Sequence, residues 1–153
     1  MHPLTQAWLI NDRIGRYLVE AISEADWETK LAKGKSVAGQ FAHIHSVRLM
    51  WLKVIDPSLE GSIPKLDGAG REETVAALTA SGKAVADVVE NALASAVRIK
   101  NFKPTTEAFV GYLISHESNH RGQAELALRQ AGVPLPDKVA YGLWEWGSRG
   151  AEL

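Results

Sequence analysis

Four long segments of this chain place apolar residues at the spacing of a helix, and no segment shows the every-second-residue alternation of a strand. The clearest example runs from residue 3 to residue 22, where a proline that suits a first helical turn precedes a regular apolar stripe. The stripe consists of Leu4, Ala7, Ile14, Leu18, Ala21 and Ile22. Helices of this kind bury one face against their neighbours, so the pattern predicts a helical bundle.

Capping residues and helix breakers mark the other three segments. A second helix is predicted from Ser36, a suitable N-cap, to the Asp-Pro break at 56–57. A third is predicted over residues 71–96, because its first turn is acidic and suits the positive end of a helix dipole. A fourth is predicted to begin after Thr105 and to end at the Gly-Val-Pro sequence of 132–134.

The segments between these helices are of three kinds. Residues 23–35 suggest a short helical turn, whereas residues 57–70 contain two prolines and three glycines and suit a long crossover. Residues 133–153 have no clear period. We therefore predict a single all-α domain over residues 1–153, built as an antiparallel four-helix bundle with a long crossover loop and an irregular C-terminal tail.

Composition narrows the classes of function. With 153 residues, 46% hydrophobic, the chain suits one compact core, and its net charge of -1 gives no basic face for nucleic acid or an anionic membrane. The absence of cysteine removes disulfides and thiolate ligands, so a bound metal would need imidazole or oxygen. No secretion leader or membrane-spanning run is recognisable, and we expect a cytoplasmic, soluble protein.

His116 and His120 are the strongest indication of chemistry. They lie one helical turn apart, so both rings point the same way and can hold one divalent cation. A helical projection places them on one inward face of the fourth helix, together with Phe109, Tyr112, Leu113, Gln123 and Ala127. Buried imidazole nitrogens are costly when unpaired, so the alternative to a metal is a pair of hydrogen-bonded or partly solvated rings.

A third ligand would have to come from another helix. On the predicted second helix, His43 and His45 flank the apolar stripe on either side of Ile44. Each could face a neighbouring helix or solvent, and helical periodicity does not choose between them. Three imidazoles would leave coordination positions open for water or substrate.

Two motifs together resemble the DinB/YfiT-like superfamily of small bacterial helical proteins. The first is His43 eight residues before Trp51, and the second is the later His-x-x-x-His pair of His116 and His120. The resemblance extends over roughly residues 2–136. It implies that His43 is the third metal ligand, with His45 beside the site, in a four-helix bundle that is often a homodimer.

The resemblance also implies a range of activities. Characterised relatives include S-transferases that use low-molecular-weight thiols and a mycothiol-dependent isomerase. A cation held by three neutral imidazoles lowers the pKa of a water or thiol bound to it, so the expected function is thiol-dependent S-transfer to, or hydrolysis of, a small electrophilic substrate. Zinc is expected first, with nickel or iron as alternatives. The other hypotheses are a metal or small-ligand binding protein without turnover, and a structural module that binds no metal.

Glu117 completes a formal His-Glu-x-x-His sequence, the signature of zinc peptidases in which the glutamate is the general base. Its position on the helix suits that role but also suits a partly solvated flank. A peptidase would need a further ligand downstream and an edge strand to hold a peptide, and the sequence predicts no strand. The peptidase is therefore a remote alternative.

Other polar and aromatic residues near the motifs have two interpretations each. Gln123 could bond a ligand ring or be an ordinary core amide, whereas Arg121 is expected to be solvated rather than to bind an anionic group. For Asn11 we expect a core amide satisfied by backbone or water, with a role in the site as the alternative. Trp144 and Trp146 are expected to cover the open end of the bundle, with a dimer contact or a pocket wall as alternatives.

Overall fold

A computed structural model describes all residues from 1 to 153 and contains four long helices and no strand. The long helices are α1 (Pro3–Ala21), α2 (Val37–Ile55), α3 (Arg71–Ala94) and α4 (Thr106–Gln130). Their predicted caps are present, since Ser36 Oγ accepts a hydrogen bond from the Gly39 amide and Thr105 Oγ1 accepts one from Ala108. None of the helices is both long and apolar enough to span a membrane.

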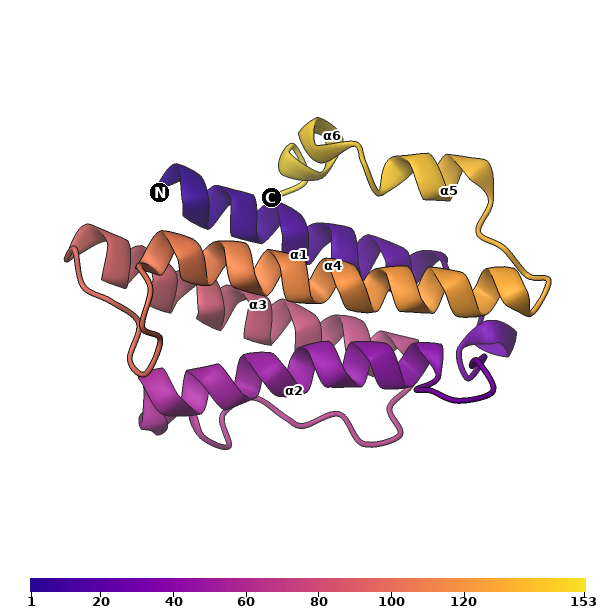
Figure 1. Ribbon diagram of the computed structural model, residues 1–153, viewed down its shortest axis with the longest axis horizontal. Coiled ribbons are helices and arrows are strands. Elements are labelled where there is room, and N and C mark those ends of the chain that lie inside the picture. Colours follow the sequence, from indigo (N-terminus) through magenta and orange to yellow (C-terminus); the bar gives the residue numbers. More distant parts are fainter.

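The four helices pack side by side, and the predicted crossover runs along the outside of α2 (Figure 1). It begins with a single turn of 3-10 helix, η2 (Pro57–Leu59), and returns the chain to the end of the bundle where α2 began. As a result α2 and α3 run in the same direction, whereas α1 and α4 run opposite to both. The prediction of a helical bundle with a long crossover is confirmed.

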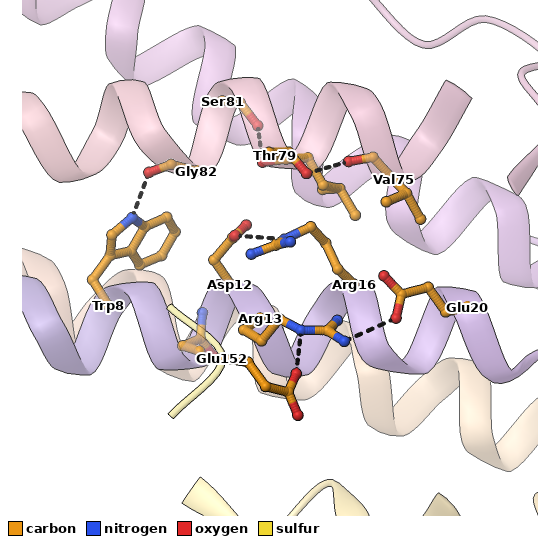
Figure 2. A network of polar contacts seen from close by, with 12 residues as sticks. Trp8, Asp12, Arg13, Arg16, Glu20, Val75, Thr79, Ser81, Gly82 and Glu152 are labelled. Carbon is orange, nitrogen blue, oxygen red and sulfur yellow. Dashed lines mark hydrogen bonds and ion pairs between the residues drawn. The ribbon is translucent and has the colours of Figure 1, made fainter. Parts of the chain in front are cut away.

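The segments flanking the bundle contain short helical elements. Residues 24–26 form a 3-10 turn, η1 (Glu24–Asp26), as the sequence suggested. The tail, predicted to be irregular, contains α5 (Asp137–Gly142) and α6 (Trp146–Gly150), which are too short to show a period in the sequence. Both lie alongside α1 and α4 (Figure 1). Arg13 of α1 binds Glu152, at 2.6 Å, and so fixes the end of the tail (Figure 2).

The core consists of two apolar clusters separated by polar residues. One cluster includes Leu18, Phe41 and Leu128, and the other includes Trp8 and Phe109. Between them all four helices contribute buried polar side chains, here called the central polar layer, made up of Asn11, Asp12, Arg48, Ser81, Glu117 and Arg121. Burial of charge on this scale requires close pairing, and the pairing fixes how the helices are rotated against one another.

At the α1–α3 contact, a glycine lets the backbones approach. Trp8 Nε1 donates to the carbonyl of Gly82 at 2.9 Å, and Asp12 lies one turn further along α1, paired with Arg16 (Figure 2). A side chain at Gly82 would collide with the Asp12 carboxylate, because its Cβ would lie 2.5 Å from Asp12 Cγ. Gly82 is therefore a steric requirement of this helix pair.

Candidate metal centre

Three histidines from two helices converge on the side of the bundle where α2 faces α4. His43 comes from α2, and His116 and His120 come from successive turns of α4. One ring nitrogen from each lies within 4.8 Å of the other two. Two imidazoles bound at about 2.1 Å can span about 4 Å, so small rotations of the rings would complete a set of three ligands. All three side chains are partly exposed, which leaves the cluster open to small molecules.

A chain of two amides holds the His120 ring. Gln40 Oε1 lies 2.7 Å from His120 Nδ1, and Gln40 Nε2 donates to Gln123 Oε1 at 3.1 Å. Because an amide oxygen only accepts, Nδ1 of His120 carries the proton and Nε2 keeps its lone pair. This is the arrangement by which a second residue orients a metal-binding imidazole. The sequence offered Gln123 as such a partner, but the residue that contacts the ring is Gln40.

His116 lacks such a partner. Its Nδ1 is buried and forms no hydrogen bond, and its nearest aromatic neighbours are the rings of His120 and His43, with centroids 4.5 Å and 5.4 Å away. A buried nitrogen without a partner is costly, and a cation within the cluster would satisfy one nitrogen of this ring. The residues present therefore fit a divalent metal with imidazole ligands.

Burial and neighbouring positive charge lower the pKa values of two of these rings, His43 and His120, and keep them uncharged near neutral pH. The pKa of His120 is lowered to about 4, first by burial and then by the neighbouring His116 and His43. The pKa of His43 is also lowered, mainly by burial and next by Lys35. Neutral imidazoles offer their lone pairs to a cation without first losing a proton.

His45, the alternative third histidine, faces away from the cluster. It is fully buried, with Nδ1 3.1 Å from Ser81 Oγ on α3 and Nε2 2.8 Å from the carbonyl oxygen of Pro64 in the crossover. Both of its nitrogens are therefore occupied by structural bonds. The structure brings His43, and not His45, to the α4 pair, as the family resemblance implied.

The predicted orientation of α4 was partly wrong. The centre of its buried stripe is occupied by Glu117 and Arg121, and the two histidines lie at the edge that faces α2. Glu117, only 1% exposed, accepts from Arg48 Nε at 2.7 Å and from Asn11 Nδ2 at 2.8 Å. A carboxylate enclosed in this way fits neither of the two positions considered for Glu117, a partly solvated flank or a general base. The peptidase hypothesis therefore lacks an accessible general base.

Arg121 and Asn11 also differ from expectation. Arg121 is 7% exposed rather than solvated, and its Nη2 donates to Asn11 Oδ1 at 2.8 Å and to Ser118 Oγ at 2.9 Å. The Asn11 amide is thus satisfied by charged side chains and not by backbone or water. Asp12 and Arg48, at the middle of the layer, were not predicted. Arg48 lies one helical turn after Ile44 on the apolar stripe of α2, so its spacing could have indicated that it is buried.

The tryptophans of the tail do not close the end of the bundle. Trp144 is 81% exposed and Trp146 is also exposed, and both lie near Ile14 of α1 and Arg121 of α4. Together with α4 they line a small cavity, so the pocket-wall alternative describes their place better.

Comparison with known proteins agrees with this architecture. A family model described as "DinB family" matches residues 2–147, nearly the whole chain. No curated protein matches the sequence.

Proposed function

The chain belongs to the DinB family, and on that premise and its three-histidine cluster we propose that it is a divalent-metal-dependent enzyme acting on a small electrophilic substrate. We propose thiol-dependent S-transfer or hydrolysis as the reaction, through His43, His116 and His120 as ligands. The observation that carries the proposal is the approach of three ring nitrogens from two separate helices to within 4.8 Å.

The neighbours of the cluster support a binding role. Gln40 orients the His120 ring, and the lowered pKa values of His43 and His120 leave their lone pairs free. When bound, a cation held by three neutral ligands keeps its charge and lowers the pKa of a water or thiol that joins it. Partial exposure of the three histidines gives a small molecule access.

Metal content tests the first step. Protein purified without an affinity tag and supplied with zinc, nickel or iron should hold close to one equivalent by elemental analysis, with zinc expected first. His116→Ala should reduce the content below about a tenth of an equivalent, because two remaining imidazoles bind weakly. His2→Ala, at an exposed histidine outside the cluster, is the matched control. Equal content in wild type and His116→Ala would refute the site.

Turnover tests the second step. The metal-loaded protein should accelerate the reaction of a small thiol with an activated aryl chloride, or the hydrolysis of a nitrophenyl ester. The acceleration should disappear both on chelation and in His116→Ala. One equivalent of metal without either acceleration would instead support the alternative, a non-catalytic metal or small-ligand binding protein.

A further inference from the structure

The cavity beside the tail tryptophans lies on the side of α4 remote from the histidines. It has a volume of about 220 Å³, is partly open to solvent, and is bordered by α4, α1 and the tail. Ser118, Arg121 and Gly122 form its α4 wall, and Leu143, Trp144 and Trp146 form the opposite one. Residues two and six positions after His116 lie roughly on the opposite face of a helix, so this cavity is separate from the candidate metal centre.

The cavity contains a buried cation that lacks a directly bonded anion. Only Nη2 of the Arg121 guanidinium forms hydrogen bonds, and both go to neutral oxygen atoms. Nη1 has no hydrogen-bond partner, and its nearest carboxylate oxygen, Glu117 Oε2, is 3.9 Å away. Both oxygens of that carboxylate are already engaged by Arg48, and Oε2 also by Asn11.

An incompletely paired charge on a buried side chain is unfavourable, and an anionic ligand would relieve it. Arginine is well suited to this role, because its planar group presents several donors to a carboxylate. The remaining lining is largely apolar and aromatic, which suits a ligand with a hydrophobic part. The volume is below the roughly 300–1,000 Å³ typical of drug-sized ligands, so the ligand must be small.

We propose that this cavity binds a small organic monocarboxylate, with the carboxylate at Arg121 and Ser118 and the apolar part against Leu143 and the two tail tryptophans. The site requires no metal and goes beyond the proposed function.

Glu125 also lines the cavity and affects which ligand charge is favoured. Burial raises the pKa of its carboxyl group, and the nearby Arg129 and Arg121 oppose that rise. In its protonated form it can donate a hydrogen bond to a carboxylate, whereas in its ionised form it would repel any anion, and a dianion more strongly than a monoanion. A monocarboxylate is therefore favoured over a dicarboxylate or a phosphate ester.

Nuclear magnetic resonance of the chelator-treated full chain, titrated with benzoate, tests the proposal. Among the five tryptophan indole N–H signals, those of Trp144 and Trp146 should shift saturably, with a dissociation constant of about 1 mM or lower. Benzamide, the neutral analogue, should bind at least about tenfold more weakly. Absence of a saturable shift, or an equal response to benzamide, would overturn the proposal.

Two variants locate the site. Arg121→Gln should weaken benzoate binding about tenfold or more, whereas Arg98→Gln, at an exposed arginine elsewhere, should not change it. Because Arg121→Gln also disturbs the central polar layer, Gly122→Leu provides a test that leaves the layer intact. No atom outside the helix backbone lies within 4 Å of a Cβ built at Gly122, so the new side chain can be accommodated in the cavity. Unchanged benzoate affinity in Gly122→Leu would place the binding elsewhere and refute the site.

Glu125→Gln distinguishes two explanations, a cavity that binds an external anion and an Arg121 that pairs with Glu125. If the cavity is a ligand site, the substitution should leave benzoate affinity unchanged or raise it, because it removes a negative charge. If Arg121 instead pairs with Glu125 in solution, wild type should show no benzoate binding and Glu125→Gln alone should show it. That second result would contradict the proposal.

Discussion

The three histidines are held in different ways, although they belong to one cluster. His120 is fixed through Gln40, whereas His116 has a buried nitrogen without any partner. The orienting bond therefore acts on one ring alone. Gln40 therefore positions the His120 ring and does not contact the other two rings through a hydrogen bond.

Gln40→Leu should weaken zinc binding by about 10–100-fold, because the His120 ring would lose the bond that fixes its tautomer and orientation. Competition against a zinc-binding dye measures the change directly. Gln6→Leu, at an exposed glutamine of α1, is the matched control and should bind zinc as wild type does. Unchanged affinity in Gln40→Leu would show that the ring is fixed by other contacts.

Arg48, unlike the partly exposed histidines, is buried and binds only other groups of the protein. It is 1% exposed and binds both Asp12, at 2.7 Å, and Glu117. Arg48→Met should reduce the free energy of unfolding by about 3–5 kcal/mol, because two buried carboxylates would lose their shared cation. Chemical denaturation measures this loss. Arg16→Met, which removes a partly exposed partner of the same Asp12, should cost about 1 kcal/mol or less, and equal losses would contradict the account.

The residues of the candidate site could be predicted where their spacing along a helix places them on one face. The His116 and His120 pair follows from helical geometry, and His43 followed from the family resemblance because periodicity left His45 open. Gln40, Arg48 and the buried position of Glu117 depend on how α2 and α4 are rotated in the bundle. That rotation is fixed by charge pairing between helices distant in the sequence, which a pattern within one helix does not contain.

Among the elements, the contact between α1 and α3 depends on one missing side chain. Gly82→Ala should reduce the free energy of unfolding by about 1–3 kcal/mol, because Asp12 is held by Arg48 and Arg16 and has no room to move. Gly111→Ala, at an exposed helical glycine with no atom within 4 Å of the new Cβ, should instead be neutral or stabilising by up to about 1 kcal/mol. A loss of the same size at both positions would rule out the steric explanation.

The crossover is attached to the bundle through His45, which binds Pro64 O and Ser81 Oγ. His45→Leu should make trypsin cleave after the exposed Lys65 several-fold faster, because the segment would open more often. Cleavage after Lys138, in the tail, serves as the internal reference. Metal content should be unchanged in this variant, and its loss would indicate that His45 does take part in the cluster.

The elements themselves were largely predictable because their signals are local. Ser36 and Thr105 cap the helices as expected, and the prolines and glycines of 57–70 mark the crossover. The short helices α5 and α6 were not predicted, because five or six residues give no measurable period. Their placement beside α1 depends on contacts such as Arg13 with Glu152, far apart in sequence.

For the molecule as a whole, a bound cation would link α2 to α4. An excess of zinc of about one hundred times the dissociation constant should stabilise the fold by about 2.7 kcal/mol and raise Tm by about 5–10 °C. Scanning calorimetry of His120→Ala should show no such rise, whereas His2→Ala should behave as wild type. A rise of equal size in both variants would mean that zinc stabilises the protein at another site.

The wide separation of the three histidines along the polypeptide has a consequence for the order of assembly. About 70 residues lie between His43 and the α4 pair, and closing a loop of that length in a disordered chain costs roughly 4 kcal/mol of entropy. Before the bundle forms, a cation meets at most two imidazoles one turn apart. We therefore expect metal capture to follow bundle formation, so that zinc slows unfolding while leaving the refolding rate unchanged in stopped-flow kinetics.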